Sequence, residues 1–187
     1  MGKYVIDLVE AITELDQHSD LHAARLLLLL FTFAEGPHGN SIEGLTKLAK
    51  LDFLLRYPLM LERALVAKHR SASDVQIEDH ERFSVESQMV RYRFGPWDHR
   101  YREFLNILTA KELASVSVEG RTFVISITDK GRGCARRVSA DQTFEPYLRR
   151  AALLKRHFDL TATNLMRFIY DTFPEVVSLR SNDPIVA

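Results

Sequence analysis

The feature that most constrains this chain is an uninterrupted run of apolar side chains, Leu26 to Phe31. In a helix that begins near Asp20, this run is apolar around the whole circumference. A helix without a polar face must lie at the centre of a domain or be covered by another chain. The apolar stretch continues only to Ala34, well short of the roughly 20 residues that span a bilayer. We therefore predict a buried helix, either at the centre of the domain or covered by another chain, and we expect no membrane-spanning segment.

The segments on either side of this run are also predicted to be helical. Residues 4–17 form an amphipathic pattern with an acidic outer face. A further helix is predicted to open at residues 40–43, where Asn and Glu are spaced as in a capping box. Pro58 interrupts that helix, and a shorter helix follows over 59–68. Residues 69–83 are the most polar stretch, which predicts a loop or internal linker.

The periodicity changes after residue 84. An alternating run over 85–94 is typical of a strand. Apolar residues then recur at helical spacing over 97–111, which predicts a helix with one buried face. That face comprises Trp97, Tyr101, Phe104, Leu105 and Leu108. Two short β-type runs follow, 114–118 and 122–127, joined by a tight turn centred on Gly120.

This order of elements is that of a winged helix, with 97–111 as the recognition helix and 114–127 as the wing. The passage from Tyr101 to the Thr128–Gly131 corner resembles many winged-helix sequences. The predicted fold is mainly α (α+β): a winged-helix unit with a β-hairpin wing, extra N-terminal helices and a C-terminal helical extension. The predicted parts are an N-terminal helical part (1–68), a polar loop (69–83), the winged-helix unit (84–140) and the C-terminal extension and tail (141–187). The alternative is an unrelated helical domain that carries one β-hairpin.

Two polar residues of the predicted recognition helix, Arg102 and Asn106, face outward on a helical wheel. Arginine and asparagine on an exposed helix are suited to hydrogen bonding with base edges in the major groove. Arg121, in the turn of the predicted wing, is placed to meet a phosphate. Glu103 lies on the same helix face and would repel the DNA backbone. A solvated surface therefore explains the pattern as well as base reading does.

The whole chain is electrically balanced, with 25 basic and 25 acidic residues, so any electrostatic attraction must come from local segregation. Residues 130–156 contain eight basic side chains, opposed only by Asp141 and Glu145. The eight are Lys130, Arg132, Arg136, Arg137, Arg149, Arg150, Lys155 and Arg156. The first 20 residues are acidic, with one lysine against five carboxylates. Three roles stay open for the basic segment: non-specific binding of DNA phosphates, docking of an acidic partner surface, and pairing with the chain's own acidic helix.

The sequence offers little material for catalysis. The seven histidines form no His-Glu-x-x-His motif, and there is no phosphate-cradling glycine loop and no Gly-x-Ser-x-Gly elbow. A single cysteine, Cys134, cannot build a cysteine-rich zinc site. We therefore expect a protein that is not an enzyme, with no catalytic residue, no metal site, no cofactor and no small-molecule substrate.

The first ten residues also bear on location. Asp7 and Glu10 stand where a signal peptide requires an unbroken apolar core. The one apolar run elsewhere, Leu26 to Phe31, is too short to cross a bilayer. From these observations we expect a cytoplasmic protein that does not bind membranes.

Beyond these patterns, the chain resembles the middle components of ABC-three-component systems over residues 40 to 175. Four stretches carry the resemblance: 45–58 (LTKLAKLDFLLRYP), 61–65 (LERAL), 92–101 (YRFGPWDHRY) and 164–175 (NLMRFIYDTFPE). These systems are bacterial conflict systems, of which Lamassu anti-phage defence is the known example. The resembling stretches are structural signatures without catalytic content.

The resemblance implies a small non-catalytic adaptor subunit in anti-phage or anti-plasmid immunity. Such a subunit would join an SMC-like ATPase to an effector, often a nuclease, in a hetero-complex, and would assist binding of double-stranded DNA. The all-round apolar helix and the oppositely charged segments fit a chain that functions within a complex. The alternative is a stand-alone winged-helix transcription regulator, which predicts a homodimer and sequence-selective DNA binding.

Overall fold

The structure is a computed structural model, and it describes residues 19–34, 41–78, 81, 89–92, 95–180 and 185. The predicted helix over 4–17, with the acidic residues in it, lies outside the described residues. So do residues 85–88, 93 and 94 of the predicted alternating run. Among the described residues no helix is both long and apolar enough to traverse a bilayer.

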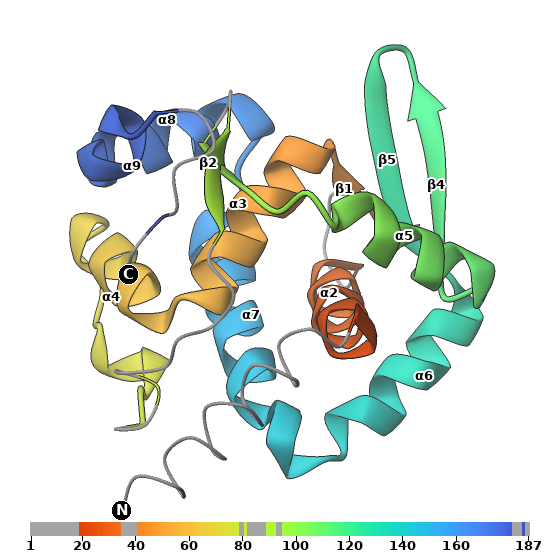
Figure 1. Cartoon of the computed structure of the whole chain (residues 1–187). Coiled ribbons are helices and arrows are strands. Elements are labelled where there is room, and N and C mark those ends of the chain that lie inside the picture. Colours follow the sequence, from red (N-terminus) through yellow and green to blue (C-terminus); the bar gives the residue numbers. More distant parts are fainter. Residues whose placement is uncertain are drawn as a thin grey trace, which may run out of the picture.

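Helix α2 (Ser19–Ala34) runs through the centre of the molecule, which is one of the two placements that its apolar run allows. Leu26 and the four leucines after it are at most 2% exposed. Figure 1 shows α2 surrounded by three other helices, α5 (Tyr101–Ala110), α6 (Asp129–Ser139) and α7 (Glu145–Phe158), and α2 contacts each of them. A helix covered on all sides needs no polar face, which explains its unusual composition.

Helix α3 (Leu45–Arg56) ends two residues before Pro58, and α4 (Pro58–Ala67) starts at that proline. The predicted interruption is thereby confirmed, because Tyr57 before the proline is extended, with φ −111° and ψ 90°. Two helices lie near the C-terminus, α8 (Ala162–Thr172) and α9 (Pro174–Ser178). The polar loop contains the 3-10 helix η1 (Ser73–Val75), and a second 3-10 helix, η3 (Gln142–Phe144), precedes α7.

The predicted hairpin is confirmed as β4 (Ala114–Glu119) and β5 (Thr122–Ile127), with Gly120 at φ 62° in its turn. A third strand, β1 (Ser41–Glu43), pairs antiparallel with β5 and gives the strand order β1-β5-β4. The predicted helix start at residues 40–43 is therefore wrong. Because Ile42 is fully buried opposite Ile125, this segment gains more as a strand than as a helical turn.

The residue that separates β1 from α3 is Gly44, at φ 91° and ψ 134°. Its N–H donates to the Phe123 carbonyl oxygen at 2.7 Å, which extends the contact with the hairpin. A glycine adopts this backbone conformation without the strain that a side chain would add. The chain leaves the sheet at this residue, and the helix begins at Leu45.

The predicted helix over 97–111 begins only at Tyr101, so the prediction was wrong for Trp97. That residue belongs to β3 (Gly95–Trp97), which pairs with β2 (Val90–Tyr92). A turn around Asp98 separates strand from helix, because the Asp98 side chain accepts a hydrogen bond from the N–H of Arg100 at 2.9 Å. The rest of the predicted stripe is confirmed as buried. It comprises Tyr101, Phe104, Leu105 and Leu108.

The fold is mainly helical with a small antiparallel sheet, as predicted. The sheet joins segments that lie far apart in the sequence, since β1 comes from the first part of the chain and β5 from residues 122–127. Helix α2 packs on α5, α6 and α7 in the same way. The polar segment over 69–83 thus connects parts of one continuous core and does not separate two cores.

Candidate functional site on the hairpin face

The base of the hairpin is held firmly by the core. Ile125 and Ile127 of β5 are 0% and 6% exposed. Directly after β5, Thr128 caps α6 by accepting a hydrogen bond from the N–H of Gly131 at 2.9 Å. A Cβ atom at Gly131 would come within 1.9 Å of the Leu113 carbonyl oxygen, so only glycine fits this contact. These contacts fix the hairpin relative to α6.

Beyond this base, one face of the hairpin exposes apolar side chains to solvent. The register pairs Val116 with Ile125 and Val118 with Phe123, and cross-strand partners share a face of the sheet. Exposure rises from 0% at Ile125 to 37% at Val116, 45% at Phe123 and 62% at Val118. Figure 1 shows the hairpin projecting from the helical body. Three apolar side chains that continue the core onto the surface suggest a contact site.

A groove of about 640 Å³ lies between this apolar face and α5. Its lining residues are Leu45, Arg102, Leu105, Asn106, Thr109, Ala110, Val116 and Phe123. Arg102 and Asn106, predicted as contact residues, are both exposed in this lining. The structure therefore places these two beside an apolar surface that faces solvent.

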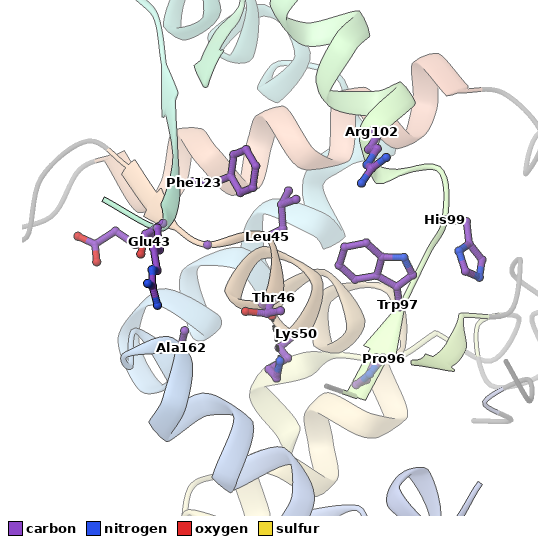
Figure 2. A pocket seen from close by; sticks show the side chains of 13 residues that line it. Glu43, Leu45, Thr46, Lys50, Pro96, Trp97, His99, Arg102, Phe123 and Ala162 are labelled. Atoms are coloured by element: carbon purple, nitrogen blue, oxygen red, sulfur yellow. Dashed lines mark hydrogen bonds between the residues drawn. The ribbon is translucent and has the colours of Figure 1, made fainter. Parts of the chain in front are cut away.

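A second hollow, of about 670 Å³, adjoins the groove, since Leu45, Arg102 and Phe123 line both. Figure 2 shows the Trp97 ring between Arg102 and Lys50 in this pocket. The remaining lining residues are Glu43, Gly44, Thr46, Pro96, His99, Arg121, Thr122 and Ala162. They come from the β1–α3 junction, β3, the turn before α5, the hairpin turn and α8. The pocket exists only where these elements meet.

Lys50 is the most unusual residue of this pocket. It is 1% exposed, and its Nζ donates a hydrogen bond to the Thr46 carbonyl oxygen at 3.2 Å (Figure 2). No carboxylate of the described residues forms an ion pair with it. Burial lowers the pKa of the Lys50 ammonium to about 8. An enclosed cation without a counterion costs free energy, which an anion in the pocket would offset.

Two further cations, Arg102 and Arg121, line the same pocket and are exposed, without an ion pair among the described residues. One carboxylate, Glu43, also lines it, so the cations outnumber the anions. Sequence reasoning selected both arginines but missed Lys50. In the sequence, Lys50 is one polar residue of an amphipathic helix pattern, which carries no signal of its burial.

The eight basic residues predicted over 130–156 do not form one exposed surface. Arg150 is 2% exposed and pairs with Glu81 at 2.6 Å, so it is unavailable to an outside partner. Lys155 donates to the Thr32 carbonyl oxygen of α2 at 2.8 Å. Three others are engaged in exposed or half-exposed ion pairs: Lys130 with Glu112, Arg132 with Asp129, and Arg149 with Glu145. Exposed and without such a pair in the described chain are Arg136, Arg137 and Arg156.

A group of buried charges, absent from the sequence-based expectations, joins α2, α3 and the turn before α5. Asp52 is fully buried and accepts hydrogen bonds from Arg25 Nε at 2.7 Å and from Arg56 Nη2 at 3.0 Å. The Tyr101 hydroxyl donates to the same carboxylate at 2.8 Å. Arg56 Nη1 continues to Asp98 at 3.0 Å. We call these five residues the α3 charge cluster.

Strong electrostatic coupling holds this cluster in its ionised form. Burial opposes ionisation of Asp52, but Arg25 and Arg56 hold the pKa of its carboxyl well below the usual range. Burial also opposes ionisation of Asp98, where hydrogen bonds from Arg100 and the charge of Arg56 lower the pKa to about 2. Each carboxylate therefore stays charged at neutral pH and neutralises an arginine beside it.

The described residues contain no group of three or more His, Cys, Asp or Glu side chains placed to hold a metal ion. Cys134, half-buried in α6, is a free thiol in this structure. The hairpin face thus offers two kinds of binding surface, an open apolar groove and a cationic pocket that contains Trp97.

One comparison with known proteins gives a match. The family described as ABC-three component (ABC-3C) system Middle Component 4 matches residues 34–163 of the chain, which is well over half of it. No curated protein and no solved structure matches the chain. The matched range begins at the end of α2 and includes the hairpin, α6 and α7.

Proposed function

Because the chain belongs to the ABC-three component (ABC-3C) system Middle Component 4 family, we propose that it is a non-catalytic adaptor that binds a partner subunit through its hairpin face. The family supports a role in an ABC-three-component system. In our proposal the partners are an SMC-like ATPase and an effector, often a nuclease, in anti-phage or anti-plasmid defence of the Lamassu kind. The adaptor would hold these two together in the cytoplasm.

The observation that carries this proposal is the apolar end of the hairpin. Val116, Val118 and Phe123 are exposed although the same face is part of the core at its base. Burying such side chains against another chain yields free energy in proportion to the apolar area removed from water. Arg102 and Arg121 border this surface, which favours a partner with acidic groups around an apolar centre.

We further propose that α2, β1, α3, α5 and the hairpin make up a winged-helix unit, with α5 as its recognition helix. The order helix, strand, helix, helix, hairpin supports this proposal, as does the pairing of the first strand with the second strand of the hairpin. In this arrangement the insertion between α3 and α5 carries α4 and β2–β3.

DNA engagement is a separate part of the proposal. Arg136 and Arg137 on α6 and Arg156 on α7 are exposed and have no ion pair among the described residues. Three arginines provide a modest, salt-sensitive attraction to phosphates, which suits a subunit that assists other DNA-binding chains. A stand-alone transcription regulator is the second candidate, favoured by the exposure of Arg102 and Asn106 on α5.

Co-expression of the chain with the products of its neighbouring genes tests the adaptor role. The wild-type chain is expected to copurify with a large ATPase subunit in a stable complex. Val118→Asp, on the hairpin, is expected to abolish copurification, because a charge in an apolar interface is costly to desolvate. The matched control is Val66→Asp on α4, since Val66 is 59% exposed and Val118 is 62% exposed.

Copurification that survives Val118→Asp and Phe123→Asp together would overturn the proposed surface. A wild-type chain that copurifies with no neighbour, forms a homodimer and protects a defined DNA sequence would instead support the transcription regulator. In that case Arg102→Ala with Asn106→Ala is expected to relax sequence selectivity, whereas the adaptor reading predicts little change.

A further inference from the structure

We propose that the pocket between α3, β3 and the hairpin turn binds a nucleotide, with its phosphate at Lys50 and its base against Trp97. This site goes beyond the adaptor role and does not depend on it. The pocket volume of about 670 Å³ lies within the range of small-molecule sites in proteins, about 300–1,000 Å³. Its walls come from α3, β3, the hairpin turn, α5 and α8.

The phosphate end of the site is defined by Lys50. Its ammonium is enclosed by protein, and its one hydrogen bond among the described residues goes to the Thr46 carbonyl oxygen of its own helix. Buried lysines are normally paired with a carboxylate, and none of the described carboxylates pairs with this one. An anion bound in the pocket would supply the missing negative charge.

The surroundings of Lys50 also favour an anion. Arg102 and Arg121 line the pocket, with Glu43 as the one lining carboxylate. Gly44, where α3 starts, lies in the wall, and no described side chain caps this helix. The N–H groups of an uncapped first turn attract phosphate groups.

The base end of the site is defined by Trp97. The indole is half-buried, lies in the pocket wall and is held by an edge contact with Tyr101 at a centroid distance of 5.3 Å. Figure 2 shows the ring between Arg102 and Lys50. A rigid aromatic ring next to cations is how proteins stack bases while they bind the attached phosphate. A nucleotide therefore fits this pocket better than inorganic phosphate, which leaves the indole unused.

The intrinsic fluorescence of the protein reports on this site directly, because Trp97 is the one tryptophan of the chain. Titration with adenosine monophosphate is expected to change the fluorescence saturably. Adenosine and inorganic phosphate are each expected to bind at least tenfold more weakly. Equally tight binding of inorganic phosphate would contradict the proposed contact between the base and Trp97. The whole proposal would be overturned if neither the nucleotide nor any phosphorylated oligonucleotide bound.

Two sources can supply this chemistry, a free nucleotide and the phosphorylated end of a DNA strand. A trideoxynucleotide with a 5′-phosphate and the same molecule with a 5′-hydroxyl distinguish them. Tighter binding of the phosphorylated trimer than of the mononucleotide would assign the pocket to strand ends. Binding of the mononucleotide alone would assign it to free nucleotides, and either result supports the site.

Variants test whether the fluorescence change comes from the proposed contacts. Lys50→Met removes the ammonium and keeps an apolar stem, and it is expected to weaken nucleotide binding at least tenfold. Because Arg102 is exposed, Arg102→Ala should leave folding intact, and it is expected to weaken nucleotide binding severalfold. The control, Arg70→Ala, lies after α4, exposed and outside the pocket, and should bind like the wild type. Unchanged binding in both pocket variants would overturn the proposal.

Discussion

Helix α3 carries buried charges in two places. In one the charges are paired with opposite charges, and in the other the charge is unpaired within the described part of the chain. Asp52 and Arg56 belong to the α3 charge cluster, in which each carboxylate contacts an arginine at 3.0 Å or less. Lys50, only two residues before Asp52, is as deeply enclosed but has no carboxylate partner among the described residues. Both places are buried, so burial alone does not explain the difference.

What differs is the neighbour on each side of the helix. The cluster faces α2 and the turn before α5, whose side chains complete its charges, whereas Lys50 faces a pocket. Removal of one partner from a balanced buried cluster leaves an unpaired charge in the core and strongly destabilises the fold. An unbalanced buried charge beside a hollow costs stability and is explained by binding. The comparison predicts opposite effects of removing one charge from each place.

The largest effect is expected from Asp52→Ala. This change leaves Arg25 and Arg56 buried without their carboxylate, and breaking a buried ion pair in this way costs about 3–5 kcal/mol. Urea denaturation followed by circular dichroism measures the loss. The matched control is Asp129→Ala, whose exposed contact with Arg132 at 4.0 Å is screened by solvent and should change stability far less. An equally small loss of unfolding free energy for Asp52→Ala would contradict the distinction between the paired charges and Lys50.

A smaller effect of opposite sign is expected from Lys50→Met. Because burial disfavours the charged ammonium, its replacement by an apolar side chain of similar length should raise the free energy of unfolding at pH 7 by roughly 1–3 kcal/mol. Denaturation of the variant without nucleotide tests this. A loss of stability would show that the ammonium supports the fold, contrary to the comparison.

The same lysine gives the wild type a pH dependence that the variant lacks. The pKa of Lys50 is about 8 in the folded chain and 10.5 as its ordinary value, so the unfolded chain binds more protons between these values. Wild-type stability should therefore rise with pH from 8 to 10.5 relative to Lys50→Met. The other ionisable groups that line the pocket are Glu43, His99, Arg102 and Arg121.

The smallest effect is expected from Tyr101→Phe. This change removes one hydrogen bond to Asp52 and leaves both arginine contacts in place, so a loss of about 1–2 kcal/mol is expected. Combination with Asp52→Ala in a double-mutant cycle sharpens the comparison, because the tyrosine should then contribute much less. Additive losses would show that the hydroxyl acts independently of the cluster.

Much of the fold could be predicted from local patterns. The central helix, the break at Pro58 and the hairpin about Gly120 each follow from periodicity or backbone restriction within a short window. One of the two errors occurred where distant segments meet, and the other at a turn formed by neighbouring residues. Ser41–Glu43 became a strand through pairing with β5, and Trp97 left the helix because Asp98 forms a turn in front of it.

The candidate site was predictable only in part, because residues distant in the sequence complete it. Exposed residues such as Arg102, Asn106 and Arg121 could be selected from a helical wheel and a turn position. Arg150 was selected with them, yet it is buried against Glu81, a residue 69 positions earlier in the chain. No local pattern indicates such a partner. The sequence predicted that the apolar residues at the end of the hairpin lie in strands, but it did not indicate that they are exposed.

By itself, the sequence determined most of the described helices, the hairpin, and that one helix must be buried. These properties depend on the order of residues within a few turns of the chain. Only the tertiary structure decided which charges are matched, so that Asp52 stabilises the core while Lys50 faces a hollow. The physical reason is that the free energy of a buried charge depends on what surrounds it, and those surroundings are assembled from residues distant in sequence.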